Sequence, residues 1–202
     1  MKTIQFAAVA AASLLTAACM SGRGDSDMQS SMMPNSSSSS DTVMVGGEAM
    51  LPSQTIVDNA VNSEDHTTLV AAVQAAGLVE TLQGPGPFTV FAPTNAAFEK
   101  LPAGTVDTLL MPQNKAQLTN VLTYHVVPGR IDAEELMSRI EAGGGTATLT
   151  TASGGTLTAM MNGPHNVVIH DSSGGAAQIS VYDVYQSNGV IHVVTDVLLP
   201  SA

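Results

Sequence analysis

The chain has 202 residues, of which 44% are hydrophobic, and its formal net charge is −11. This length is enough for one domain with its own core beside a short leader. The negative charge excludes binding to nucleic acid, because phosphates would be repelled, and the single cysteine excludes an intramolecular disulfide.

The first residues have the composition of a secretory signal peptide. Lys2 precedes a short apolar stretch from Ile4 to Leu15 and then small residues, so we expect residues 1–18 to direct general export and to be cleaved. Cys19 follows a Leu-Thr-Ala-Ala sequence that is similar to a bacterial lipobox, and lipidation of Cys19 is the favoured interpretation. Plain cleavage, giving a soluble secreted protein, is the alternative. With Met20 after the cysteine, the anchored protein would be directed to the outer membrane or face the periplasm if two membranes are present.

Residues 19–53 are rich in Ser and Met and show no apolar periodicity. Such a composition favours a flexible tether that holds a folded domain, residues 54–202, away from the membrane. An Arg-Gly-Asp tripeptide at residues 23–25 is expected to be a chance occurrence. Thioether sulfurs are ligands for Cu(I), so copper binding is an open alternative for the tether methionines, which are Met28, Met32, Met33, Met44 and Met50.

Helices are predicted in the first part of the folded chain. The first covers residues 55–61, and a second begins at Ser63 and ends at Gly77. A strand at 88–92 is followed by a short helix capped by Thr94 or Asn95. Further helices cover 105–110, with Thr105 as its cap, 113–123, and 133–140, which Asp132 caps.

Strands dominate the rest of the chain. Residues 124–127 are expected to continue from a helix into a strand. Short β-rich segments separated by Gly-containing turns then follow, at residues 146–150, 156–161, 167–170, 178–185 and 190–194. Helices followed by strands indicate the α+β class.

Three segments together resemble the fasciclin (FAS1) domain. They are Phe88–Pro102, Leu122–Pro128, which contains Tyr124-His125, and Gly189–Leu199, which contains His192. The match in order and spacing covers about residues 54–201. The resemblance implies a single domain in which a wedge of two β-sheets is flanked by short α-helices. It also implies a non-catalytic adhesion or interaction module.

The resemblance suggests which residues matter. The Tyr-His segment of fasciclin domains is linked to adhesion, so the candidates for partner contact are Tyr124, His125, Val126 and Val127. The pattern also includes Asn95, as a cap, and Asp183 with Asn188-Gly189, where we expect a hairpin turn with left-handed backbone. A histidine in a buried strand needs a hydrogen-bond partner, so His192 is expected to bond a backbone carbonyl or a hydroxyl.

No motif of a hydrolase, zinc protease or phosphate-binding loop occurs, so we expect no enzyme activity and no cofactor. The five histidines lack ligand spacing, so we expect no metal site. The predicted function is a membrane-anchored envelope module that binds surface proteins or glycans and is monomeric or weakly self-associating. The alternatives are a carrier of a small apolar ligand and a copper-handling lipoprotein.

Overall fold

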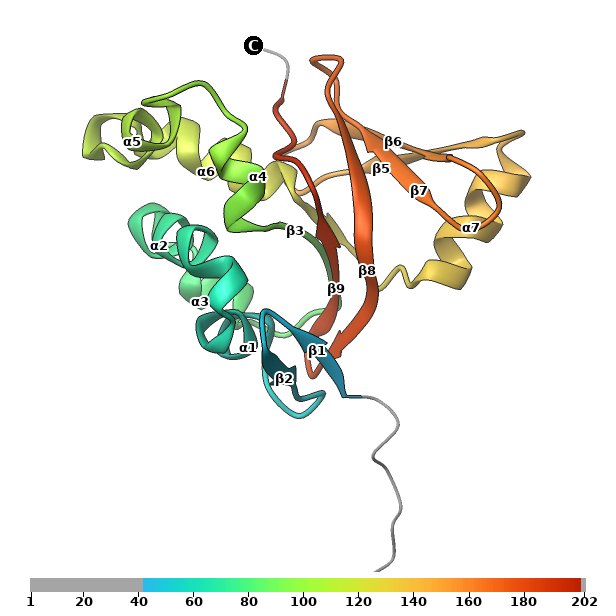
Figure 1. The fold of residues 1–202 in the computed structure, drawn as a ribbon, viewed down its shortest axis with the longest axis horizontal. Helices are drawn as coiled ribbons and strands as arrows, with labels where there is room; N and C mark the ends of the chain where they lie inside the picture. The colour runs from blue at the N-terminus through green and yellow to red at the C-terminus, as the bar shows by residue number, and fades with distance from the viewer. Residues whose placement is uncertain (1–41, 201–202) are drawn as a thin grey trace, which may run out of the picture. The chain divides into compact units, whose positions relative to one another are not determined.

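A computed structural model describes residues 42–200. The expected signal peptide, Cys19 and the tether up to residue 41 therefore lie outside the described residues. None of the helices within 42–200 combines the length and the hydropathy that crossing a membrane requires. In Figure 1, all the helices but the last lie on one side of the domain, and the last helix lies on the other side together with most of the strands. The α-helices are α1 (Ile56–Asn62), α2 (Thr67–Ala76), α3 (Val79–Leu82), α4 (Asn95–Glu99), α5 (Thr105–Leu110), α6 (Lys115–Tyr124) and α7 (Ala133–Ala142).

Seven strands form a continuous sheet in the order β4-β3-β9-β8-β7-β6-β5. All neighbours are antiparallel except β3 and β9, which run parallel. The strands are β3 (Phe88–Pro93), β4 (Val126–Pro128), β5 (Thr146–Thr150), β6 (Thr156–Met161), β7 (Val167–His170), β8 (Ala176–Gln186) and β9 (Gly189–Val194).

The long strand β8 joins the two sheets that the sequence predicted into one. Its first part pairs with β7 and its second part with β9, and its register shifts between Ile179 and Val184. Such irregularities bend a strand and increase its twist. The two ends of the sheet approach each other, because the Ala152 N–H donates to the Val126 carbonyl at 2.7 Å. The sheet is therefore nearly closed.

Two apolar cores lie on the two sides of this sheet. The first packs α1, α2 and α6 against β3 and β9, with Leu69, Val73 and Leu122 among its buried residues. The second packs α7 against β5, β6 and β7 through Leu136 and Ile140, both fully buried. Buried and exposed residues alternate along β5 and β6, so every other side chain of these strands contributes to the second core.

A short hairpin precedes α1 and corrects one boundary. Strands β1 (Val43–Val45) and β2 (Glu48–Met50) pair around a Gly46-Gly47 turn, and both glycines have positive φ. Val45 and Met50 are buried in the first core. The tether was predicted to extend to residue 53, but the folded structure already begins at residue 43. The reason is that these two side chains bury apolar surface against the domain.

The helices confirm several local predictions and correct others. Gly77 ends α2 in the left-handed conformation, and Asp132 caps α7 by accepting from the Glu135 N–H. The N-cap of α5, however, is Gly104 rather than Thr105. Tyr124 is the last residue of α6, so the segment 124–127 begins as helix and becomes strand only at Val126.

Candidate functional site

Tyr124 lies at the end of α6 and is fully buried. Its hydroxyl donates to the Thr156 carbonyl at 2.7 Å and accepts from the Ser172 N–H at 3.0 Å. Its ring lies against Gly155, where an added Cβ would come within 2.6 Å of the ring. A single side chain therefore holds both the β5–β6 turn, residues 151–155, and the β7–β8 turn, residues 171–175.

His125 is the C-cap of α6 and is only 3% exposed. Its Nδ1–H donates to the Val121 carbonyl at 2.8 Å, and its Nε2 accepts from the Leu198 N–H at 3.0 Å. Both bonds require the neutral ring with the proton on Nδ1. Burial lowers the pKa of His125 to about 4, against smaller opposing effects of the Val121 carbonyl and the Asp171 carboxylate. His125 therefore fastens the C-terminal segment to α6 as a neutral group.

Val126 and Val127 point to opposite sides of β4. Val126 belongs to the first core and Val127 to the second, and both are buried. The four residues predicted to contact a partner thus offer no exposed side chain in this structure. Their geometry assigns them a positioning role. Participation of the segment in adhesion remains a prediction.

Asn95 ties three elements together from the first position of α4. Its side-chain oxygen accepts from the Thr68 N–H at 3.0 Å, and its amide donates to the Glu64 carbonyl at 2.8 Å. Asn95 was expected to cap its own helix, α4, but its side chain bonds the first turn of α2 instead. Thr94 occupies the N-cap position of α4 and makes no side-chain hydrogen bond there. The sequence pointed to Asn95 but not to this partner helix.

Asn188 and Gly189 connect β8 with β9, but the expected left-handed backbone is wrong. Neither residue has a positive φ. Gly189 is required for a different reason, because a Cβ there would run into the Phe88 carbonyl of the neighbouring strand β3. The side chain of Asn188 accepts from the Ile56 N–H and donates to the Leu82 carbonyl, which links the turn to α1 and α3.

Asp183 is the one described non-glycine residue with positive φ, at 54°. It lies at the irregular part of β8, and its carboxylate accepts from the Ala133 N–H at 2.7 Å, at the start of α7. Beside it, the fully buried His192 donates from Nε2 to the Ile131 carbonyl at 2.8 Å. Burial lowers the pKa of His192. Asp183 and His192 thus fix the entry of α7 onto the sheet.

His66 was not singled out by the sequence as a structural residue. It is 3% exposed, and its Nδ1 lies 2.9 Å from the Ser63 hydroxyl. Burial lowers the pKa of His66, against a smaller opposing effect of Asp65. Within residues 42–200, no three His, Cys, Asp or Glu side chains are arranged to hold a metal ion.

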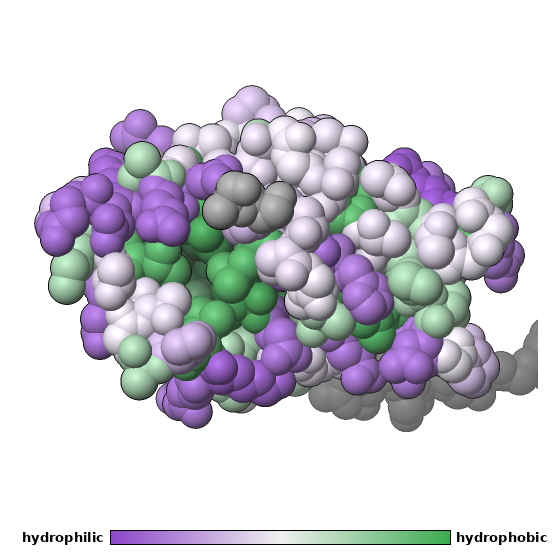
Figure 2. All heavy atoms as spheres, turned by 90° about the horizontal axis from the view of Figure 1, so that it is seen from above, coloured by the Kyte–Doolittle hydropathy of each residue, from purple (hydrophilic) through white to green (hydrophobic). Residues whose placement is uncertain are grey.

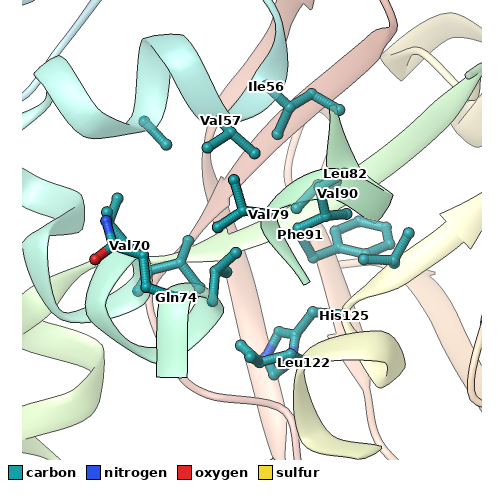
Figure 3. Close-up of a pocket in the computed structure, with 14 residues that line it drawn as sticks. Ile56, Val57, Val70, Gln74, Val79, Leu82, Val90, Phe91, Leu122 and His125 are labelled. Carbon is teal, nitrogen blue, oxygen red and sulfur yellow. The ribbon is translucent and has the colours of Figure 1, made fainter. Parts of the chain in front are cut away.

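An apolar cavity of about 40 Å³ lies between the helices and the sheet. Aliphatic side chains from α1, α2, α3, β3 and α6 surround it, with His125 at one side and the amide of Gln74 at its margin (Figure 3). Figure 2 shows apolar surface gathered in a hollow on the side of the molecule that carries the helices. The apolar lining offers no free group for covalent chemistry.

In this fold, the buried polar residues described above bond backbone groups of neighbouring elements and so have structural roles. A family model for the fasciclin domain matches residues 64–200. Protein sll1483 of Synechocystis is 46% identical over 159 residues, which are 79% of this chain and 81% of that protein. The cell surface glycolipoprotein MPB83 of Mycobacterium bovis is 33% identical over 78% of this chain and 66% of its own length.

A solved structure, that of a FAS1 domain pair from the insect cell adhesion molecule fasciclin I, has the same fold. Its TM-score is 0.54 at 17% identity, and the match covers 70% of this chain and 45% of the solved chain. The chain described here belongs to the fasciclin family. FAS1 domains are non-catalytic adhesion or interaction modules, and this domain is one of them.

Proposed function

We propose that this protein is held at the cell envelope by a lipid on Cys19 and that its FAS1 domain contacts surface proteins or glycans. The composition of residues 1–18 supports export, and the sequence before Cys19 supports lipidation. The relative MPB83, named a cell surface glycolipoprotein, supports the same location.

The contact surface that we favour is formed by residues 151–155 and 171–175, which we call the loop face. Ala152, Gly154 and residues 172–174 are exposed there. The carrying observation is that the Tyr124 hydroxyl bonds Thr156 and Ser172 at once, which fixes the two turns relative to each other. Loops held by a rigid scaffold are common sites of recognition. This would give the buried Tyr-His segment an indirect role in adhesion.

The loop face predicts weak individual contacts. Its residues are small or polar, from Thr151 to Gly155 and from Asp171 to Gly175, and none is aromatic. Strong contacts usually depend on buried aromatic or Arg anchors. Many copies on one membrane would compensate, because multivalent attachment raises the overall affinity without new contacts.

The copper alternative receives no support from the two methionines of the described hairpin. Met50 pairs with Val43, whereas Met44 pairs with Ala49, so Met44 and Met50 face opposite sides of the hairpin. Met50 is 3% exposed and Met44 is 61% exposed. These two sulfurs therefore cannot bind one ion together in this conformation.

Fractionation of cells that express the full chain tests the anchor. Wild-type protein is expected in the membrane fraction, and a Cys19→Ala variant is expected in the soluble exported fraction. Retention of Cys19→Ala in the membrane would contradict lipid anchoring.

Binding of the full chain to whole cells and envelope extract tests the loop face. Ala152→Arg adds bulk and charge on the exposed loop without removing the Ala152 N–H bond to Val126. The matched control is Ala116→Arg on the exposed side of α6. We expect saturable binding that Ala152→Arg lowers and Ala116→Arg leaves unchanged. Equal binding by both variants would contradict this choice of surface.

A further inference from the structure

The sequence contains two Asn-Gly pairs, and the fold places them in different surroundings. Asn162-Gly163 lies in the turn between β6 and β7, and Asn188-Gly189 lies in the turn between β8 and β9. In such a pair the backbone nitrogen of the glycine can attack the side-chain amide of the asparagine, because glycine has no Cβ to hinder the approach. In a folded protein the attack also requires that both groups are free to move.

The pair between β6 and β7 meets this requirement. Asn162 and Gly163 are both exposed. Within residues 42–200, neither the Asn162 side chain nor the Gly163 N–H has a hydrogen-bond partner. Gly163 has a φ of 86°, and no atom lies within 4 Å of the position that a Cβ would take there. The side chain of Asn162 therefore has room to turn toward the backbone nitrogen.

The pair between β8 and β9 is held in place instead. The Asn188 side chain makes three hydrogen bonds, to backbone groups of Ile56, Leu82 and Gly84. Gly189 is buried, with a strand paired on either side. Because three hydrogen bonds must break before the side chain can turn, the reactive conformation is expected to be at least about tenfold rarer than in the first pair.

Asn166, in the same turn as Asn162, shows that exposure is not enough. It is exposed as Asn162 is, but Val167 follows it. The Val167 N–H donates to the Tyr182 hydroxyl at 2.8 Å, so this nitrogen is already bonded. The branched Cβ of valine also crowds its own backbone nitrogen. Asn166 is therefore expected to stay intact where Asn162 reacts.

We propose that Asn162 is a site of spontaneous deamidation, which slowly converts the folded protein into a form with one more negative charge. The Gly163 nitrogen bonds to Cγ of Asn162, and the side-chain nitrogen leaves as ammonia with the proton that the Gly163 nitrogen gives up. Water then opens the resulting cyclic imide. Opening at Cγ gives aspartate, and opening at the main-chain carbonyl gives isoaspartate. The overall reaction consumes one water and releases one ammonia.

The modification changes the turn between β6 and β7. Aspartate adds a negative charge to residues 162–166, which contain no Asp, Glu, Lys or Arg. Isoaspartate adds one atom to the backbone of the segment that the Asn162 N–H closes by donating to the Asn166 carbonyl at 2.7 Å. This turn lies at the opposite end of β6 and β7 from the loop face. The inference is therefore independent of the proposed function, and either can fail alone.

Incubation of the folded full chain at weakly alkaline pH in water enriched in heavy oxygen, followed by peptide mass spectrometry, tests the site. Each deamidation during the incubation incorporates an oxygen atom from the water. We expect this label at Asn162 at a rate at least about tenfold higher than at Asn188 or Asn166. In urea, which unfolds the chain, Asn188 is expected to react about as fast as Asn162, whereas Asn166 stays slow.

Two substitutions in the same exposed turn assign the product. Aged wild type is expected to give a more acidic species in anion-exchange chromatography. Asn162→Gln should abolish this species, because the longer side chain closes a ring less readily, and Asn166→Gln should leave it unchanged. The proposal is overturned if the folded chain gains label at Asn162 no faster than at Asn166, or if Asn162→Gln forms the acidic species as wild type does. Slow reaction of Asn188 in urea would contradict protection of that residue by the fold.

Discussion

The buried His125 predicts a specific loss of stability on acidification. Its pKa is about 4 in the folded protein, whereas an unfolded histidine titrates near 6.5. Between these two values the unfolded chain binds a proton that the folded chain does not. The stabilising contribution of neutral His125 is therefore complete above about pH 6.5 and is lost as the pH falls toward 4.

The expected loss is measurable. A pKa difference of about 2.5 units corresponds to roughly 3 kcal/mol, and most of it, about 2–3 kcal/mol, falls between pH 7 and pH 4.5. His125→Asn removes the titration, and the Asn amide can still donate to the Val121 carbonyl. It leaves the buried Leu198 N–H without its acceptor, which costs about 1–3 kcal/mol at pH 7.

Urea unfolding of the full chain at pH 7 and pH 4.5 measures both effects. The free energy of unfolding of wild type is expected to fall by about 2–3 kcal/mol more between these pH values than that of His125→Asn. Burial also lowers the pKa values of His66 and His192, so part of the acid sensitivity remains in the variant. The control is His165→Asn at an exposed position. Equal losses in wild type and His125→Asn would show that protonation of His125 does not cause the acid sensitivity.

Three further substitutions test the packing around the site by chemical denaturation. Tyr124→Phe keeps the ring but leaves two backbone groups without the hydroxyl, and it is expected to cost about 1–2 kcal/mol; Tyr185→Phe, at a half-buried position, should cost less than about 0.5 kcal/mol. Gly189→Ala places a Cβ against the backbone of β3 and should cost about 3 kcal/mol of stability. Gly47→Ala is the control, because Gly47 has a positive φ but open space around it, and it should cost about 1–2 kcal/mol. A smaller cost for Gly189→Ala than for Gly47→Ala would contradict the predicted clash. Asp183→Ala removes the hydrogen bond to the Ala133 N–H at a position with positive φ, and it should cost about 2 kcal/mol of stability. Asp183→Asn keeps a side-chain oxygen that can accept this bond and should cost less. Equal costs for the two variants would show that this hydrogen bond does not stabilise the start of α7.

Local chemistry explains which elements could be predicted from the sequence. Asp132 marks the start of α7 because its carboxylate caps the helix within three residues. Strands β5, β6 and β7 have the predicted bounds, since inward and outward residues alternate between glycine turns. The hairpin at residues 43–50 was missed because its strands are only three residues long and are held by distant core residues. The Gly46-Gly47 pair was the one local signal.

The candidate site could be predicted only in part, because its function depends on distant contacts. The sequence selected Tyr124, but its partners are 32 and 48 residues further along the chain. The sequence likewise selected Gly189, but the Phe88 carbonyl that excludes a side chain there belongs to another strand.

Cell binding by three folded full-length variants tests recognition through the loop face. We expect Ala152→Arg to lower saturable binding by covering the loop face, and Tyr124→Phe to lower it by loosening the two turns behind that face. Ala116→Arg is expected to bind as wild type does. Undiminished binding by both Ala152→Arg and Tyr124→Phe would contradict recognition through the loop face.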